Sequence, residues 1–431
     1  MEPSAGDVRG RFPIGAAATI GELEADPHPL LARLRASEPV SWLPALDGWL
    51  VTRRDLALAA LRDAATFTVD DPRFSTAQVI GPSMLSLDGA EHARHRDPFA
   101  RAFRPAATRA RFAAFVAAEV DRLVGALRPR GAAELRGELA GPLAVAVIAH
   151  ALGLRAVDPP TVRSWYEAFV ATISDITAGR PGEHATAAAA GGAGKSAGEA
   201  AHERAYARLR ASVEAAIREG GAAEPAEPAE PAGADPLLVA AARELPPADV
   251  VANAAVLMFG GIDTTEGMIT NAVLHLLDHP GQLALVRAEP ALVAEAIEES
   301  LRLEPSASVV DRYATRDIEL GGAPIRAGDL VRVSLAAAGR DPAAFPDPDR
   351  FDVRRAGLGK QLAFAHGPHF CFGAPLARLE THAVLTALLH RLPGLRADPA
   401  RRHPPRGLVF RKPAALYVRW NAGSAGVSAG R

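Results

Sequence analysis

The chain has 431 residues, a formal net charge of −2, 48% hydrophobic and 23% charged residues, which is the composition of an ordinary globular protein. A net charge close to zero gives no overall positive potential that would attract nucleic acid. No stretch reaches the ~18 uninterrupted apolar residues that a membrane span requires, and residues 1–15 lack the apolar core of a secretory signal. The sequence therefore predicts a cytoplasmic protein without a membrane anchor or a nucleic-acid partner.

Helical periodicity dominates the chain, with apolar residues recurring every three or four positions. Helices are predicted over 28–37, 53–62, 105–128, 138–153, 161–178, 201–219, 247–277, 280–288, 290–303 and 374–391. Strands are predicted over 40–43, 49–52, 317–320 and 329–334, with a turn at Asp47-Gly48 between the first two and a closing hairpin over 407–419. The stretch from 63 to 87, rich in Asp, Pro and Gly, is predicted as loop. The fold class is mainly α with small β-sheets.

Two segments of biased composition interrupt this pattern. Residues 185–200 are rich in small side chains, and residues 223–232 read AEPAEPAEPA, a spacer punctuated by proline. Neither is long enough to mark a domain boundary. We therefore predict an N-terminal extension over 1–27, one domain over 28–419 and a disordered tail over 420–431.

The single cysteine, Cys371, excludes an intrachain disulfide and a multi-cysteine metal site. A lone cysteine is usually a small buried hydrophobe, so its neighbours decide its role. They read FAHGPHFCFG from Phe364 to Gly373, directly before the helix predicted at 374. A helix N-terminus stabilises a thiolate. Gly367 and Gly373 let the backbone approach a flat macrocycle, and Phe364 can shield the sulfur from water.

The spacing F-x-x-G-x-x-x-C-x-G resembles the haem-binding signature of the cytochrome P450 family, and every fixed position matches. The resemblance extends from about residue 28 to 419. It implies the family's triangular, helix-rich fold and haem b as cofactor, with Cys371 as the metal ligand through its thiolate. The haem is then expected between the long helix at 247–277 and the helix that follows the cysteine.

Two further motifs resemble those that hold the cysteine loop in this family. Glu299-Ser-Leu-Arg302 matches its E-x-x-R, and Pro348-Asp-Arg350-Phe351 matches its P-x-R-F. The resemblance implies that Arg302 and Arg350 both pair with Glu299 in a buried, structural network. Gly339 stands where the family usually has Asn, which predicts a looser strand end.

In the long helix, the run from Gly260 to Thr265, GGIDTT, resembles the family's oxygen-activation motif. Each glycine weakens a helix by about 1 kcal/mol, so the pair Gly260-Gly261 indicates a groove or a close approach. The resemblance assigns Gly260 to cofactor binding, Thr264 to hydrogen-bonding the reduced dioxygen and Asp263 to delivering protons, while the thiolate supplies electron density. The alternative is a polar patch whose hydroxyls bond carbonyls one turn earlier.

The resemblance also assigns four basic residues to the haem propionates: His92, Arg96, Arg312 and His369. The first two are four residues apart and share one helical face. Asp88 and Glu91 have capping-box spacing, so Asp88 is expected to cap that helix. Pro98 leaves the helical geometry beyond this pair in question.

These assignments predict a monooxygenase that uses dioxygen to hydroxylate a hydrophobic small molecule of secondary metabolism. No flavin or iron–sulfur domain fits in the chain, so electrons from NAD(P)H are expected through ferredoxin and ferredoxin reductase, with Arg354 and Arg355 as docking candidates. The pocket is expected in segments 79–87, 169–180, 256–264, 306–310 and 408–410, in which Ile80, Met84, Leu85, Met258, Phe259, Val309 and Val310 are prominent.

Other functions remain open within the same fold. Relatives couple aromatic rings, desaturate, nitrate or use peroxide directly, and a haem-thiolate protein can also be a non-catalytic sensor or carrier. The pair Asp263-Thr264 disfavours the peroxide-driven enzyme and the sensor, because neither needs to deliver protons to dioxygen. Neither the substrate nor the oligomeric state follows from the sequence.

Overall fold

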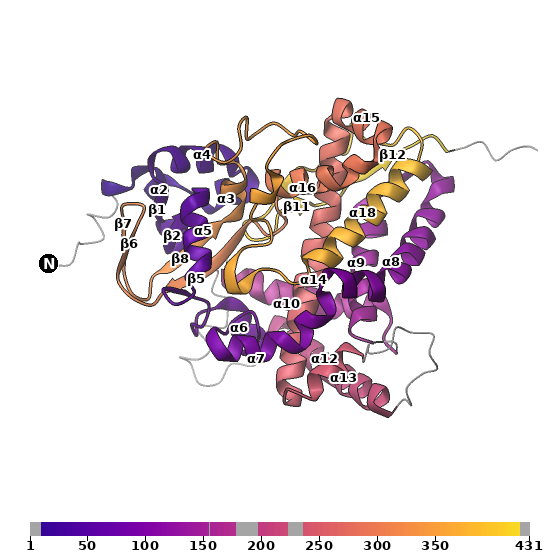
Figure 1. The fold of residues 1–431 in the computed structure, drawn as a ribbon, viewed down its shortest axis with the longest axis horizontal. Helices are drawn as coiled ribbons and strands as arrows, with labels where there is room; N and C mark the ends of the chain where they lie inside the picture. Colours follow the sequence, from indigo (N-terminus) through magenta and orange to yellow (C-terminus); the bar gives the residue numbers. More distant parts are fainter. Residues whose placement is uncertain (1–9, 155, 178–196, 223–235, 423–431) are drawn as a thin grey trace, which may run out of the picture.

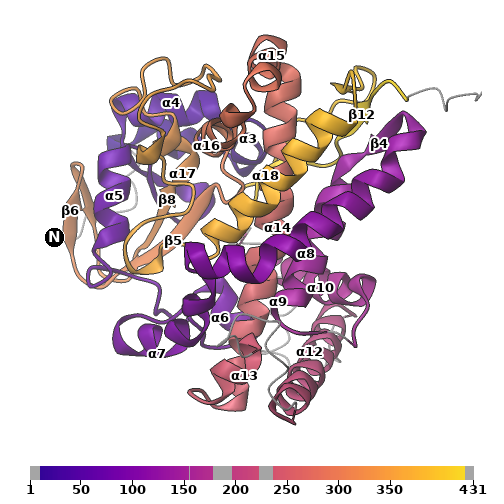
Figure 2. The ribbon, with the colours of Figure 1, turned by 45° about the vertical axis from the view of Figure 1, so that its right-hand side comes forward.

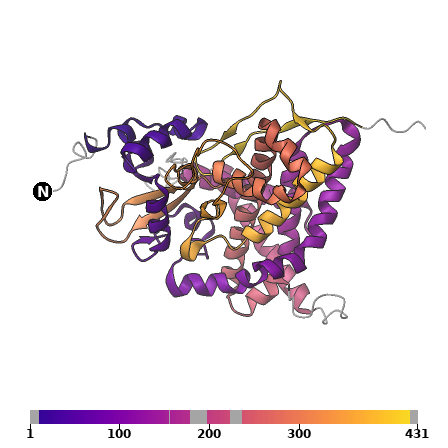
Figure 3. The ribbon, with the colours of Figure 1, turned by 45° about the horizontal axis from the view of Figure 1, so that its top comes forward.

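The computed structural model describes residues 10–154, 156–177, 197–222 and 236–422. The spacer at 223–232 and most of the segment at 185–200 lie outside these residues. Figure 1 shows a part rich in β-strands beside a larger helical part, and Figure 3 shows the same two parts with the top of the molecule turned toward the reader. No helix among the described residues is long and apolar enough to cross a bilayer.

The helical part is built around α14 (Pro247–Asp278), which runs through its centre in Figure 2. Its residues are buried on nearly every side, as expected of a helix that is apolar all round. The longer helices that pack against it are α9 (Gly141–Ala151), α10 (Pro159–Thr177), α12 (Ala197–Ala222) and α18 (Ala374–Arg391), and α8 (Pro105–Leu127) packs on α9 and α18. Shorter helices complete this part: α7 (Gly89–Ala100), α13 (Leu237–Ala242), α15 (Pro280–Ala288), α16 (Val293–Leu303) and the π-helical turn η4 (Arg136–Ala140).

The principal sheet has five strands in the order β1-β2-β8-β5-β3. They are β1 (Val40–Leu43), β2 (Gly48–Val51), β8 (Leu330–Ser334), β5 (Val309–Ala314) and β3 (Phe67–Thr68). The predicted hairpin at 40–52 is confirmed, with Val40 opposite Val51, and β2 pairs in parallel with β8. A small hairpin, β6 (Ile318–Leu320) and β7 (Ala323–Ile325), and the helices α4 (His28–Ser37), α5 (Arg54–Arg62) and α17 (Leu335–Gly339) belong to the same part.

The predicted closing hairpin at 407–419 is wrong. Instead β10 (Pro405–Arg406) pairs with β11 (Lys412–Pro413), and β12 (Tyr417–Arg419) lies between β4 (Ala132–Glu134) and β9 (Arg396–Ala397). The predicted tail also begins too early. Trp420 is buried, and its indole N–H donates to the Arg128 carbonyl at 3.0 Å, so residues 420–422 belong to the folded body. The rest of the tail lies outside the described residues.

Two segments contain more structure than their composition predicted. The expected loop at 63–87 holds β3 and the helix α6 (Ser75–Ile80). In the expected N-terminal extension, α2 (Pro13–Ala17) and α3 (Ile20–Ala25) pack on the sheet part. Buried Arg411 fixes the end of α3, because it donates to the carbonyls of residues 23–25 and pairs with Glu304 at 2.8 Å. The helix α7 continues through Pro98, which lies inside it.

Candidate functional site

A cavity of about 320 Å³ lies between α14, α18 and β5. Five of the predicted apolar residues line it: Met84, Leu85, Phe259, Val309 and Val310. Ile80 and Met258 are buried in the hydrophobic core. Further lining residues, among them Val69, Phe74 and Thr76, come from the stretch between β3 and the start of α6. The sequence interpretation missed them because it treated that stretch as loop.

Cys371 faces this cavity from the loop before α18, whose N-cap is Gly373. Burial raises the pKa of the Cys371 thiol, whereas the backbone N–H groups of Gly373 and Ala374 lower it. The Cys371 N–H donates to the Phe364 carbonyl at 3.0 Å, which closes the loop. Gly367 has φ +75°, and a β-carbon there would lie 2.3 Å from the Leu61 carbonyl, so this turn requires glycine.

Basic side chains gather at one edge of the cavity. Arg96, Arg312 and His369 line it, and the His92 ring lies 4.2 Å from that of His369. Burial lowers the pKa of Arg312 to about 10 and that of His92 to about 4. Buried His92 Nε2 has no hydrogen-bond partner among the described residues. The edge therefore combines buried positive charge with an unused polar atom, which is what a bound carboxylate would satisfy.

Asp88 does not cap α7 as predicted. Its carboxylate instead accepts from Thr68 Oγ1 at 2.6 Å, from the Val69 N–H at 2.9 Å and from His369 Nε2 at 2.8 Å. Together these bonds hold the pKa of Asp88 well below its ordinary range, although burial alone would raise it. Asp88 thus orients His369 at the edge of the cavity.

These residues fit a haem. A thiol faces the cavity from the N-terminus of α18, and the cationic groups and the orphaned imidazole nitrogen at the edge of the cavity would suit the two carboxylates of a haem. On α14, a β-carbon at Gly260 would meet nothing within 4 Å, so this face of the helix leaves open space. Gly261 instead allows a close approach between helices, because a β-carbon there would lie 2.2 Å from Ile148 Cδ1 of α9.

The side chains of Asp263 and Thr264, the proposed acid and alcohol of α14, have different surroundings. Thr264 lines the cavity, and its hydroxyl donates to the Gly260 carbonyl one turn earlier. Asp263 is 4% exposed, and its Oδ1 accepts from the hydroxyl of Tyr166 on α10 and from Lys412 Nζ on β11. No local pattern in the sequence indicated Tyr166 or Lys412 as partners. The hydrogen bond from Thr264 to the carbonyl one turn earlier is the alternative that the sequence analysis gave for this motif. The Thr264 side chain nevertheless lines the cavity.

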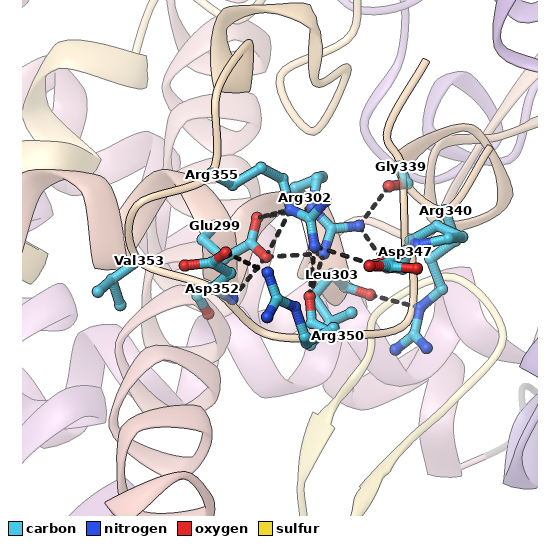
Figure 4. Close-up of polar contacts among 12 residues, drawn as sticks. Glu299, Arg302, Leu303, Gly339, Arg340, Asp347, Arg350, Asp352, Val353 and Arg355 are labelled. Carbon is cyan, nitrogen blue, oxygen red and sulfur yellow. Dashed lines mark hydrogen bonds and ion pairs between the residues drawn. The ribbon is translucent and has the colours of Figure 1, made fainter. Parts of the chain in front are cut away.

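The predicted charge cluster around Glu299 forms with a different second arginine (Figure 4). Glu299 and Arg302 are fully buried and paired at 2.6 Å. Arg355, 6% exposed, donates Nε to Glu299 at 2.9 Å, whereas Arg350 is 65% exposed and pairs with Asp352. The prediction for the Arg350 side chain is therefore wrong, and only its carbonyl accepts from Arg302. The prediction of Arg355 as a docking residue is wrong as well.

Arg302 uses all its N–H groups within this cluster, since it also donates to the carbonyls of Gly339, Pro348 and Arg350 at 2.7–3.1 Å. A β-carbon at Gly339 would lie 2.0 Å from the Arg302 carbonyl, so the position is tight rather than loose as predicted. The neighbouring Glu298 accepts from Arg378 of α18 at 2.6 Å and from Gln361 at 3.1 Å. The helix α16 therefore anchors both sides of the cysteine loop.

Comparison with known proteins agrees with this geometry. The family model for Cytochrome P450 matches residues 231–409. Over 420 residues the chain is 35% identical to the cytochrome P450 monooxygenase PikC of Streptomyces venezuelae, covering 93% of each chain. It is 36% identical to nocardicin C N-oxygenase of Nocardia uniformis subsp. tsuyamanensis, over 92% of this chain and 96% of the relative. The crystal structure of P450BioI, solved with hexadec-9Z-enoic acid ligated acyl carrier protein, superposes with a TM-score of 0.79 at 28% identity, over 94% of this chain and all of the other.

The chain belongs to the cytochrome P450 family. It is a haem-thiolate monooxygenase with the P450 fold, as predicted, and its cofactor is haem b with the thiolate of Cys371 as axial ligand.

Proposed function

We propose that this monooxygenase hydroxylates an apolar small molecule of secondary metabolism, with electrons from NAD(P)H delivered by ferredoxin and its reductase. The observation that carries the proposal is one cavity that joins Cys371, the basic edge and the apolar side chains of β5, α14 and the stretch from β3 to α6. Such a cavity can hold the cofactor and place an apolar substrate over it.

The bound haem supplies dioxygen activation, with the thiolate donating electron density to it. The chain's own residues do the rest. Cys371 would hold the iron, Arg96 and Arg312 would neutralise the propionates, and His92, whose pKa burial lowers to about 4, would act as an uncharged hydrogen-bond partner for one of them. The Thr264 hydroxyl, freed from its bond to the Gly260 carbonyl, is a polar group of α14 that can hydrogen-bond a ligand in the cavity. Asp263, the buried acid next to Thr264 in the sequence, delivers protons toward the Thr264 hydroxyl in this proposal.

The apolar lining supports the substrate class, and Phe259, Val309 and Phe410 would exclude water from the reacting region. P450BioI was solved with a fatty acid carried on acyl carrier protein, and nocardicin C N-oxygenase is named for an N-oxygenation. These two names refer to chemically different molecules, so they do not point to one substrate for this chain. The proposal therefore specifies apolarity and hydroxylation, without a particular skeleton.

The face around the cysteine loop supports docking of an electron carrier. Phe370, next to Cys371, is an exposed large hydrophobic residue at 43%. Arg54 and Arg62 of α5 lie near His366 in the same loop, where their charges help burial to lower the pKa of His366. An exposed aromatic ring beside positive charge suits a small acidic protein such as ferredoxin.

The first test is the carbon monoxide spectrum of the reduced, haem-loaded protein. Wild type should give the strongly red-shifted band of thiolate ligation, and Cys371→Ser should lose it. The second test supplies ferredoxin, its reductase and NAD(P)H with a panel of apolar compounds chosen by their displacement of the iron-bound water. Oxygen from dioxygen should appear in a hydroxylated product. A thiolate spectrum without product from any ligand that binds would instead indicate a sensor or carrier.

A further inference from the structure

A short turn between α6 and α7, at residues 83–86, forms part of the cavity wall. Met84 and Leu85, in the middle of this turn, both line the cavity. The turn is closed by its own serines, since the Ser83 N–H donates to Ser86 Oγ at 3.1 Å and the Ser86 N–H donates to the Ser83 carbonyl at 3.0 Å. These local bonds fix the shape of the turn, but they do not fix its distance from the other walls of the cavity.

Asn253 of α14 ties this turn to the central helix. Its Oδ1 accepts from the Met84 N–H at 2.8 Å, and its side chain is fully buried. The other hydrogen bonds that residues 82–87 make among the described residues stay within the turn. Val256 and Leu257, three and four residues further along α14, line the cavity, whereas Asn253 is not among the described residues that do so. One amide therefore sets the separation of two parts of the cavity wall.

The partners of Asn253 fix the orientation of its amide. Its Nδ2 donates to the Asp249 carbonyl at 2.8 Å and to Nδ1 of buried His95 on α7 at 3.0 Å. Two acceptors thus lie on the nitrogen side of the amide, and one donor, the Met84 N–H, lies on the oxygen side. A flipped amide would place oxygen against the Asp249 carbonyl and nitrogen against the Met84 N–H. The bond to Met84 is therefore held in one geometry.

Loss of the Asn253 acceptor would release the turn. A buried backbone N–H without a partner is unfavourable, and it regains a partner by moving toward water. The Met84 N–H faces α14 in the present arrangement, and Met84 is only 3% exposed. Movement toward water would therefore carry the turn away from α14, and the cavity would widen as Met84 and Leu85 withdraw.

We propose that Asn253 is a positioning residue that sets the width of the substrate cavity by holding the turn at 83–86 against α14. It acts through Met84 rather than by contact with the ligand. The inference deepens the proposed function and rests on it in one respect, because it takes the cavity as the site of the apolar substrate. Selection of substrates by size then depends on a residue outside the cavity lining.

The test is a spectral titration of the haem-loaded enzyme with imidazole, phenylimidazole and clotrimazole, which bind the haem iron directly and increase in bulk. The ratio of the dissociation constants of imidazole and clotrimazole reports the width of the cavity. Asn253→Leu keeps a similar volume but removes the amide. It should shift this ratio in favour of clotrimazole by about tenfold or more, the low end for a methylene-sized change in an apolar pocket. An unchanged ratio would overturn the proposal.

Asn271→Leu is the matched control on the same helix. Asn271 is also buried, and its Nδ2 donates to the carbonyls of Glu304 and Arg411 at 3.1 and 3.0 Å. Its replacement removes buried hydrogen bonds without touching the turn at 83–86, so the ratio should keep its wild-type value. An equal shift in this variant would mean that a general loosening of α14 changes the ratio, and the assignment to Asn253 would fail.

Two other replacements of Asn253 separate its acceptor from its size. Asn253→Asp keeps an oxygen for the Met84 N–H, and its carboxylate can pair with His95, so the ratio should stay near the wild-type value. In Asn253→Ser the hydroxyl can bond the Asp249 carbonyl one turn earlier but is too short to reach Met84. This variant should shift the ratio as Asn253→Leu does, and it carries the test if the leucine variant does not fold. A shift in the aspartate variant but not in the serine variant would contradict the proposal.

Met84→Ala tests whether Asn253 acts through the turn. This replacement widens the cavity directly, so Asn253→Leu should shift the ratio less in that background than in wild type, and full additivity would overturn the proposal. Product analysis separates this inference from the proposed function. If the ratio shifts in Asn253→Leu while the sizes of the compounds hydroxylated do not change, Asn253 sets the width of the cavity, but the cavity is not the substrate site.

Discussion

Replacing Arg355 by methionine tests the charge cluster that holds the cysteine loop. Arg355 donates Nε to both oxygens of Glu299, at 2.9 and 3.2 Å, and Nη2 to the carbonyls of Asp347 and Arg350 at 3.0 and 2.7 Å. Methionine fills a similar volume but removes the charge and every donor. Breaking a buried pair costs about 3–5 kcal/mol. Since Glu299 keeps Arg302, we expect the lower end, about 3 kcal/mol.

Arg350→Met is the matched control, five residues away in the same segment. Its guanidinium is 65% exposed and pairs with Asp352, and such exposed pairs contribute about 0–1 kcal/mol. The Arg350 carbonyl, which Arg302 and Arg355 both use, is unaffected by the substitution. The two variants should therefore differ by roughly 2 kcal/mol in the free energy of unfolding.

The assay is urea unfolding of the haem-loaded proteins followed by circular dichroism, with the fraction of haem retained measured for each variant. Arg355→Met should unfold at lower urea and retain less haem. If Arg350→Met is as destabilised as Arg355→Met, then Arg350 reaches Glu299 after all, and the assignment of Arg355 as the second arginine of the cluster fails.

Three other perturbations test the cavity and the core. Thr264→Ala should still bind haem and substrate but release hydrogen peroxide in place of product, whereas Thr264→Ser should stay coupled; product per NAD(P)H measures this, and tight coupling in the alanine variant would remove the hydroxyl from the mechanism. Burial alone would raise the pKa of Glu304, but the hydrogen bond from His28 lowers it to about 2, so its stabilisation is present above the ordinary value of 4.5 and is lost as pH falls toward 2. Glu304→Gln should flatten the pH dependence of unfolding free energy in that window, and an unchanged slope would contradict the pairing. Gly261→Ala should cost about 1–3 kcal/mol by overpacking against Ile148; Ile148→Ala in the same chain should recover much of this, and the absence of rescue would place the strain elsewhere.

Long helices were predictable because the spacing of their apolar residues indicates which faces are buried. The helix at 247–277 and the helix at 374–391 each match the observed element to within about one residue. The loop from Phe364 to Gly373 was recognisable because its chemistry depends on fixed local spacing. In contrast, α6 was missed, since its six residues lie between turn-forming neighbours that resemble a continuous loop.

Long-range partners were not predictable in the same way. A motif placed an arginine near Glu299, but the backbone turns at Asp347, which has φ +47°, and the segment then presents Arg355 inward and Arg350 outward. Similarly, β12 was expected to pair with its neighbour in sequence. Its partners are instead β4 and β9, and β4 lies almost 300 residues away along the chain.

The partners of Asp263 show the same limit. Tyr166 and Lys412 are brought to it from α10 and β11, and neither stands in a local pattern that would have identified it. The motif on α14 gave the residue types, whereas the direction of each side chain depended on which surfaces of the helix were already covered by other elements.

Three consecutive residues near the end of the chain serve three separate sites. Phe410 lines the cavity, Arg411 fixes the end of α3, and Lys412 bridges Asp263 and Glu266 of α14. Because they share one short backbone, substitutions here should show epistasis: the effect of a change at one position should depend on the residues at the other two. A variant selected for a bulkier substrate through Phe410 would then also carry altered contacts between Lys412 and α14 and altered N-terminal packing, so directed evolution of this segment should proceed by combined rather than single replacements.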